Sequence, residues 1–202
     1  MSTLITTTAQ IGTIKDAGGN ATAMTIDSAG KATVTQNVFN KNNSVVLRGF
    51  YLNAMRTSTG ATAVLTNWSE MNSASKGFKP VGVANGVTVS SGLFSFAVTG
   101  VYRCSATFHV NTNNDTRWIQ TDWAYTPNGG AETSGDTYNY VQVTQGDTTY
   151  SSFMREKYWN IAHTGDTVGL KIGSNATITI RGSTDQNGGD TWVFFEKVAE
   201  AV

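Results

Sequence analysis

The chain has 202 residues, and its 14 Lys and Arg residues balance its 14 Asp and Glu residues, so the formal net charge is zero. Nucleic acids and acidic membrane surfaces attract proteins with a basic footprint, and we therefore expect neither as a partner. Charged residues make up 14% of the chain, against roughly 25% in an average globular protein. The length suits one substantial domain, or one domain with an appendage.

The chain contains one cysteine, Cys104, so no disulfide framework is available and the fold must depend on packing. A lone thiol on the apolar face of a predicted strand is usually a small core residue and seldom a nucleophile. The first ten residues lack the basic and apolar regions of a secretory signal, and no apolar run reaches the ~20 residues that span a bilayer. We expect assembly in a cytosol without membrane insertion.

Residues 1–43 differ from the rest, because they contain a single aromatic residue, Phe39, and a weak repeat. Each copy, one starting at Thr13 and one at Thr25, has the pattern strand, Asp-x-x-Gly turn, strand. A hairpin at 27–31 would place four apolar side chains on one face: Met24, Ile26, Ala32 and Val34. Such a small unit cannot be stable alone. We therefore predict an attachment arm packed on other chains, with a flexible tail as the alternative.

The predicted domain, residues 44–202, consists of short strands separated by Gly and Asn turns, which is typical of an all-β sandwich. The predicted strands are 45–52, 93–98, 101–110, 117–126, 138–144, 150–161, 165–172, 176–180 and 191–198. Asn85-Gly86 predicts a hairpin turn within 78–89. Residues 61–77 have apolar residues at helical spacing but are rich in Thr, Asn and Ser, which favours a loop with a short turn.

The central stretch, residues 93–110, predicts two strands joined by a tight turn at Thr99-Gly100, where glycine supplies the required backbone freedom. From residue 101 onward the side chains alternate, which is the signature of a half-buried strand. The apolar face consists of Tyr102, Cys104, Ala106, Phe108 and Val110, and the other face of Arg103, Ser105, Thr107 and His109.

Three motifs resemble those of the TNF-like jelly roll, the fold of the complement globular head. The first is Phe94, Phe96, Val98, Gly100 and Tyr102, with Thr99 where that family usually has Pro. The second, Gly165-Asp166-Thr167-Val168-Gly169-Leu170, is similar to the family's G-D-x-V-x-L strand, and 191–198 takes the place of its last strand, with Phe194-Phe195 lacking the usual Gly. The resemblance covers about residues 45–200 and implies a TNF-like jelly-roll β-sandwich that assembles as a trimer.

The run from Ala23 to Thr33 resembles the opening of tail-fibre-like and other virion proteins of marine bacteriophages. The similarity covers about a dozen residues. It implies a bacteriophage virion protein whose residues 1–43 bind other virion proteins.

Two predicted strands carry large apolar residues on both faces, whereas a sandwich strand should be polar at every second position. Tyr150, Met154 and Tyr158 alternate with Phe153, Trp159 and Ile161, and Trp192 and Phe194 alternate with Val193 and Phe195. Monomers rarely leave such patches in water, so we expect the second face to pack on a neighbouring subunit. The candidates for a homotrimer interface are Tyr150, Phe153, Tyr158, Trp159, Trp192, Phe194 and Phe195.

The sequence contains no catalytic constellation. His109 and His163 lack metal-ligand spacing, and there is no Gly-x-Ser-x-Gly motif. Asp185 and Asp190 could in principle act as a glycosidase pair, but residues 183–190 are more typical of a polar loop tip, which could also bind calcium or sugar hydroxyls. We predict a non-enzyme without cofactor or metal.

Binding residues concentrate in loops, and we expect those at 111–116, 127–136 and 183–190 to meet a host-surface glycan at the end opposite the N-terminal arm. The alternative is that they are ordinary solvated turns. The candidate contacts are Asn114, Asp115, Trp118, Asn128, Asp185, Asn187 and Asp190.

The functional prediction is a trimeric tail-fibre or tip component of a bacteriophage virion, assembled in the host cytoplasm, with a role in host attachment. A capsid decoration protein, or a bacterial carbohydrate-binding adhesion module with tryptophans that stack on sugars, is the alternative.

Overall fold

The fold was analysed in a computed structural model of the chain. It describes residues 13–15, 22–26, 29, 32–34, 45–72, 80–112, 115–134, 139–143, 149–183 and 191–202. The chain divides into two compact units, residues 1–44 and 45–202, which are described separately below.

The first unit contains a three-stranded antiparallel sheet of β1 (Thr13–Lys15), β2 (Thr22–Ile26) and β3 (Ala32–Val34). Residues 26 and 32 are paired across the β2–β3 connection, and so are residues 24 and 34. The predicted hairpin is therefore confirmed. β1 adds on the other side of β2, with Ile14 opposite Met24.

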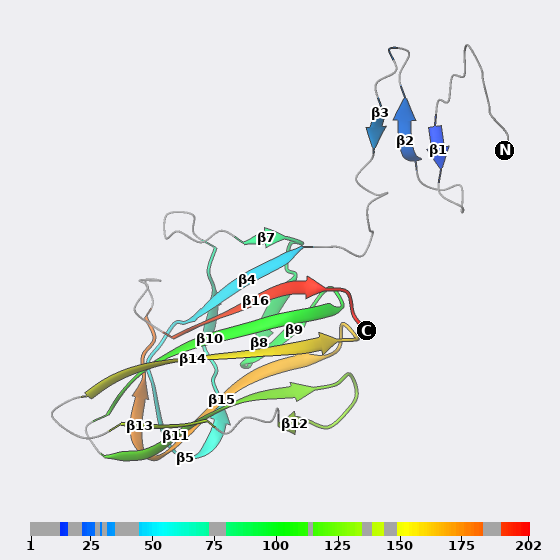
Figure 1. Cartoon of the computed structure of the whole chain (residues 1–202). Helices are drawn as coiled ribbons and strands as arrows, with labels where there is room; N and C mark the ends of the chain where they lie inside the picture. The colour runs from blue at the N-terminus through cyan, green and yellow to red at the C-terminus, as the bar shows by residue number, and fades with distance from the viewer. Residues whose placement is uncertain are drawn as a thin grey trace. The chain divides into compact units, whose positions relative to one another are not determined.

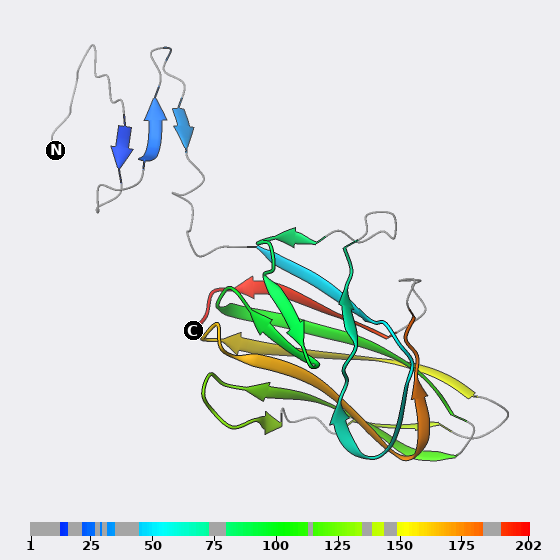
Figure 2. The same cartoon turned by 180° about the vertical axis from the view of Figure 1, so that it is seen from behind.

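The second unit is a sandwich of two antiparallel sheets, and Figures 1 and 2 look onto it from opposite sides. The front sheet has the order β6-β4-β16-β10-β14, with β7 also paired to β4. Its strands are β4 (Val46–Leu52), β6 (Trp68–Glu70), β7 (Val81–Gly82), β10 (Gly100–Thr112), β14 (Thr149–Ile161) and β16 (Trp192–Ala199). The back sheet consists of β5 (Arg56–Val64), β8 (Val87–Ser90), β9 (Leu93–Phe96), β11 (Thr116–Thr126), β12 (Thr133–Ser134), β13 (Asn139–Val143) and β15 (Thr167–Ile180).

The strand pairing is that of a jelly roll. The first strand of the sandwich, β4, pairs with the last, β16, and β10 lies between β16 and β14. In the back sheet, β15 lies between β9 and β11. The two long strands β10 and β15 meet at one end through Val110 and Ile180, which joins the two sheets in one hydrogen-bonded network. The predicted all-β jelly-roll sandwich is confirmed.

The core lies between the sheets and is centred on Phe195, which is fully buried. Its ring centroid lies 4.7 Å from that of Phe94 and 5.6 Å from that of Phe96, both on β9 of the opposite sheet. Phe50 on β4 completes the cluster at 5.1 Å from Phe94. Aromatic pairs at such separations are favourable beyond the area they bury. The apolar face predicted for 101–110 is confirmed, because all five of its side chains are buried: Tyr102, Cys104, Ala106, Phe108 and Val110.

Four local predictions about strands and turns were wrong. Within residues 61–77, expected to form a loop, residues 61–64 belong to strand β5 and residues 68–70 form β6, while residues 73–77 lie outside the described residues. Alternate β5 side chains are exposed, and Thr-rich alternation of this kind suits a strand. Asn85-Gly86 forms a turn closed by Gly86 N–H to Val83 O at 3.0 Å but joins no hairpin. The hairpin turn is at Ser91-Gly92, between β8 and β9, where both residues have positive φ as a tight two-residue turn requires.

The stretch 93–110 does form two strands, but β9 and β10 belong to different sheets, and residues 97–99 carry the chain across the sandwich. Residues 165–172 and 176–180, expected to form separate strands, lie in the single 14-residue strand β15.

Candidate functional site

The exposed apolar side chains gather on the outer surface of the front sheet, the surface that faces the viewer in Figure 1. Among the described residues, eight large hydrophobic side chains are exposed, and six of them lie on this surface. These six are Val45, Val81, Tyr150, Met154, Tyr158 and Val198. We call this surface, together with the half-buried Leu47, Trp192 and Phe194, the apolar face.

The β-sheet register explains why these side chains share one surface. Thr107 of β10 is paired with Met154 of β14 on one side and with Trp192 of β16 on the other. Cross-strand partners point to the same side of a sheet, so Met154 and Trp192 face outward together. A shallow groove of about 270 Å³ lies on this surface, lined by Leu47, Arg103, Ser105, Met154, Trp192, Phe194 and Glu196.

One ion cluster interrupts the apolar face. Nε and Nη2 of Arg103 both lie 2.7 Å from Oε2 of Glu156 on β14. Nη1 of Arg103 lies 3.6 Å from Oε2 of Glu196 on β16. The hydrogen bond and the charge of Glu156 raise the pKa of the Arg103 guanidinium above its usual value. One cation therefore faces two carboxylates, and the cluster carries a surplus negative charge.

The structure separates the predicted interface residues into two sets. Tyr150, Tyr158, Trp192 and Phe194 belong to the apolar face, as does Met154, which the same alternation indicated. Phe153, Trp159 and Phe195 point to the other side of the sheet: Phe195 is in the core, and the other two are partly buried against it. Phe153 stacks on Phe108 at 5.2 Å, and Trp159 stacks on Tyr125 at 5.0 Å.

Sequence reasoning missed the apolar residues at one end of the face, namely Val45, Leu47, Val81 and Val198. Val45 and Leu47 flank the buried Val46, and an unbroken aliphatic run of this kind does not distinguish an exposed apolar row from a core strand.

The predicted ligand loops do not gather at one end of the sandwich. Asp115 and Trp118 lie near the start of β11, whereas Asn128 follows the end of that strand. Strand β4 begins beside the end of β16, with Leu47 paired to Glu196. The 127–134 segment lies at that same end, because β11 ends opposite the start of β15. Asn128 therefore lies at the end of the sandwich where β4 begins, whereas Asp115 and Trp118 lie at the other end. Asn114, Asp185, Asn187 and Asp190 lie outside the described residues.

Asn128 has a structural role in a turn network around Asp166, the buried aspartate of the Gly-Asp motif. Asp166 accepts hydrogen bonds from the backbone N–H groups of Asn128, at 2.8 Å, and His163, at 3.0 Å. Burial opposes the charged form of Asp166. The backbone donors of His163 and Asn128 and the Tyr125 hydroxyl outweigh this effect and lower the pKa of Asp166 below its usual value.

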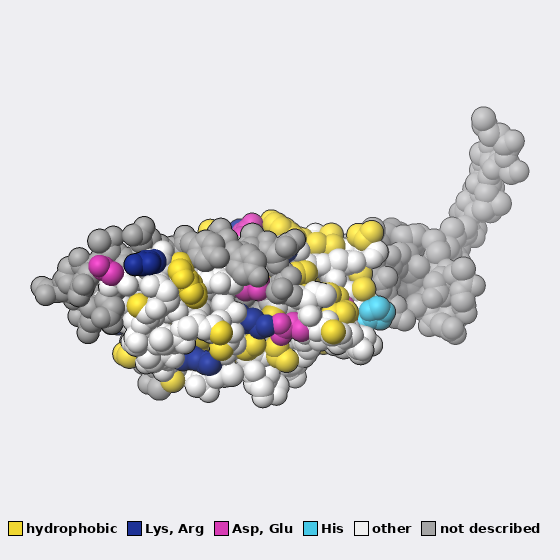
Figure 3. All heavy atoms as spheres, turned by 90° about the horizontal axis from the view of Figure 1, so that it is seen from below, with side chains coloured by type: hydrophobic (Ala, Val, Ile, Leu, Met, Phe, Trp, Pro, Cys, Tyr) yellow, Lys and Arg dark blue, Asp and Glu magenta, His cyan; other side chains and the backbone are white. Residues whose placement is uncertain are grey.

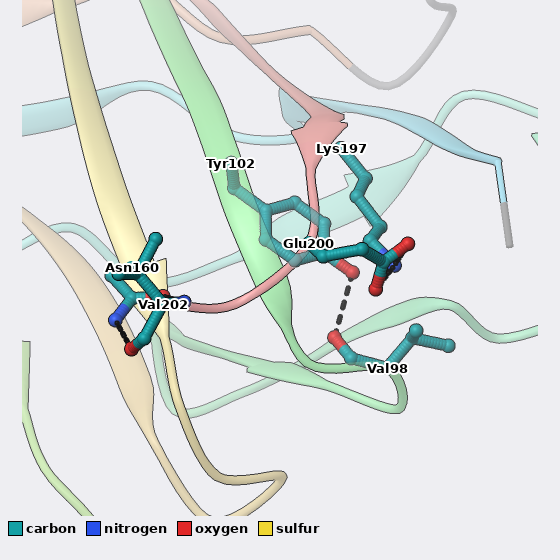
Figure 4. A network of polar contacts seen from close by, with 6 residues as sticks. All are labelled: Val98, Tyr102, Asn160, Lys197, Glu200 and Val202. Atoms are coloured by element: carbon teal, nitrogen blue, oxygen red, sulfur yellow. Dashed lines mark hydrogen bonds and ion pairs between the residues drawn. The ribbon is translucent and has the colours of Figure 1, made fainter. Parts of the chain in front are cut away.

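A second polar network closes the sandwich around Tyr102, the last residue of the first motif (Figure 4). The Tyr102 hydroxyl donates to the Val98 carbonyl oxygen at 2.8 Å, and burial raises the pKa of Tyr102 above its usual value. Asn160 donates to the Val202 carbonyl oxygen at 2.9 Å and accepts from its N–H at 3.2 Å. A Cβ atom at Gly100 would lie 2.8 Å from the Ala199 carbonyl oxygen, so only glycine fits there.

We find no catalytic arrangement in the described part of the chain. Ser152 Oγ and His109 Nδ1 are 2.8 Å apart, which resembles part of a triad, but the ion pairs of the described residues place no carboxylate on His109. Burial raises the pKa of the Cys104 thiol, so it does not resemble an activated nucleophile. No group of three or more His, Cys, Asp or Glu residues in the described ranges could hold a metal ion.

Charged side chains form no patch of one sign on the face shown in Figure 3, where they are few and scattered among polar groups. Within the described ranges, no helix has the length and apolar character needed to cross a membrane.

Together, the sandwich topology and the buried motif residues define a TNF-like jelly-roll domain. Comparison with solved structures agrees. Eiger TNF from S. frugiperda matches with a TM-score of 0.56 and 13% identity over 79% of this chain and 96% of that chain. Murine APRIL at pH 5.0 matches with a TM-score of 0.50 and 14% identity over 76% of this chain and 99% of that chain. At such identities the likeness concerns the fold. No family model and no curated protein sequence matches the chain.

Proposed function

We propose that this chain is a non-enzymatic structural protein of a bacteriophage virion. In this proposal the jelly-roll domain forms a homotrimer through the apolar face, and residues 1–43 attach it to other virion proteins. The observation that carries the proposal is the concentration of six of the eight exposed large hydrophobic side chains on one surface of one sheet.

An apolar surface of this kind favours burial against another protein surface. Tyr150 and Met154 are each 62% exposed and Tyr158 is 55% exposed in the isolated chain. Large contiguous apolar patches on soluble proteins mark interaction sites, and each large aromatic side chain can bury ~150–250 Å². Closed symmetric assembly of identical chains is the commonest way to cover such a surface.

The number of subunits and the virion role rest on different support. The TNF-like topology and the two-faced strands support a trimer. The similarity of Ala23 to Thr33 to tail-fibre-like proteins supports the virion, and there a tail-fibre or tip component is the first choice. Host attachment through the loops at the start of β11 and before β16 is part of the same proposal.

Two experiments test the proposal. Sedimentation velocity of the purified chain at micromolar concentration should give the mass of three chains. A single-chain mass would contradict the assembly. Immunogold labelling of purified particles should place the chain on the tail. Labelling of the head would favour the decoration protein, and absence from particles would favour the adhesion module.

A further inference from the structure

We propose that the Glu196 carboxylate of one copy forms an ion pair with the Lys157 ammonium of the next copy in a closed ring. This inference rests on the proposed self-assembly and names the contact that sets its register. Each copy carries one carboxylate on the apolar face and one ammonium on the adjoining edge that lack a close ion-pair partner; we call them the unbalanced acid and the unbalanced base.

Glu196 is the unbalanced acid. Arg103 makes its close contacts, both at 2.7 Å, with Glu156, and its nearest approach to Glu196 is 3.6 Å. The Glu196 side chain is 49% exposed and lies in the same groove lining as Leu47 and Phe194. A second apolar face packed here would remove this carboxylate from water, which is costly without a cationic partner.

Lys157 is the unbalanced base. It lies on β14, which pairs with β10 and with no other described strand, so β14 forms an edge of the front sheet. Its Nζ lies 5.0 Å from the centroid of the Trp159 ring. Among the described residues no carboxylate lies within ion-pair distance of it; Asp122, on strand β11 of the other sheet, feels its charge only at longer range. The ammonium is held at the edge by the aromatic ring and remains available to an acid from outside.

The two charges lie at nearly the same height along the strands. Cys104 is paired with Phe195 on one side and with Lys157 on the other, so Glu196 and Lys157 differ by one residue, or about 3.3 Å. Rotation about an axis parallel to the strands preserves height, so groups that meet across a cyclic interface must have similar heights. Arg117, an exposed cation, does not meet this condition, because it lies at the start of β11, near the opposite end of the sandwich.

The pairing also favours a ring over a two-fold dimer. Contact between the face of one copy and the β14 edge of the next is heterologous, and such contacts generate rings.

Charge reversal tests the inference. Glu196→Gln and Lys157→Gln should each weaken self-association by about tenfold or more, measured by sedimentation velocity over a concentration series. Glu196→Lys and Lys157→Glu should weaken it further, and the double variant should recover wild-type association. The matched control, Arg117→Glu, reverses an exposed cation away from the proposed contact and should leave association unchanged.

The outcomes separate the inference from the proposed function. A wild-type chain that sediments as one chain contradicts the proposed assembly itself. A wild-type trimer that neither glutamine variant weakens, or a double reversal that does not recover association, overturns the Glu196–Lys157 pair and leaves the trimer standing. The glutamine variants keep the test valid if a lysine next to Arg103 prevents folding.

Discussion

The ring of Phe194 lies directly over Gly49 of the neighbouring strand. A Cβ atom at Gly49 would come within 2.4 Å of Cε1 of that ring and 3.1 Å of Sδ of Met71. The two residues are cross-strand partners in the β16–β4 register. The absence of a side chain at Gly49 therefore leaves space for the Phe194 ring. The centroid of this ring lies 4.8 Å from that of Trp192, in an edge-to-face arrangement.

Gly49→Ala should displace the Phe194 ring and reshape the apolar face. Because the ring can move outward, we expect a loss of about 1 kcal/mol in the free energy of unfolding and weaker self-association. Urea denaturation and sedimentation measure the two effects. In a Phe194→Ala background the same glycine substitution should cost almost nothing, since the ring that it would strike is gone. An equal cost in both backgrounds would contradict the contact.

Met154→Asp should give folded chains that no longer assemble. The side chain is 62% exposed, so the isolated domain tolerates a carboxylate there, but an interface would have to bury it. The matched control is Met55→Asp, because Met55 is 65% exposed and lies outside the apolar face. Light scattering should report the loss of the trimer mass for Met154→Asp and none for Met55→Asp. Equal behaviour of the two variants would show that the face is not an interface.

Phe195→Ala should destabilise the jelly roll by about 3–5 kcal/mol, the range for removing a buried aromatic side chain. Phe195 is fully buried in the core, whereas its neighbour Phe194 is half-buried on the outer surface. Phe194→Ala should therefore lower the free energy of unfolding much less than Phe195→Ala does, as measured by chemical denaturation. It should weaken self-association more. Similar unfolding free energies for the two variants would contradict the assignment of their faces.

Asp166→Asn should change the acid limb of the stability curve. The pKa of Asp166 is lowered in the folded state, so its contribution is present above the unfolded pKa of about 3.9 and is lost as pH falls through the folded value. In the variant, the N–H group of the asparagine amide would face a backbone N–H donor, and two donors cannot form a hydrogen bond. We expect this to lower the free energy of unfolding by on the order of 2 kcal/mol near neutral pH. Thermal unfolding from pH 7 to 2 should show a smaller acid-induced loss for this variant than for the exposed-carboxylate control, Asp115→Asn.

Removal of residues 1–43 should leave assembly intact and abolish incorporation into particles. The jelly-roll unit, residues 45–202, has its own complete core, so the shortened chain should unfold cooperatively at the temperature of the full chain. Sedimentation should still give the trimer. Normal incorporation of the shortened chain into particles would refute the attachment role of the first unit.

The period of two in the side chains was sufficient to predict most strands of the jelly roll, because alternation reports which residues face the core whatever the partner strand is. It placed Tyr102, Cys104 and Phe108 on one buried face and separated Phe194 from Phe195. The Gly-Asp motif was recognisable for a related reason. Asp166 accepts from the backbone N–H of His163 in its own turn, whereas its contact with Asn128 joins residues 38 apart in the chain.

The sequence by itself therefore determined the strand content, the alternation of faces and the motifs of the fold, all of which depend on neighbours along the chain. Only the tertiary structure decided that β9 and β10 enter different sheets, and that Phe194 faces outward over Gly49 while Phe195 faces Phe94. It also decided that Glu196 and Lys157 lie within one residue of the same height, because β16 and β14 both pair with β10. The register of paired strands brings together residues that are far apart in sequence. It depends on packing across the whole sandwich, so a local sequence pattern cannot predict it.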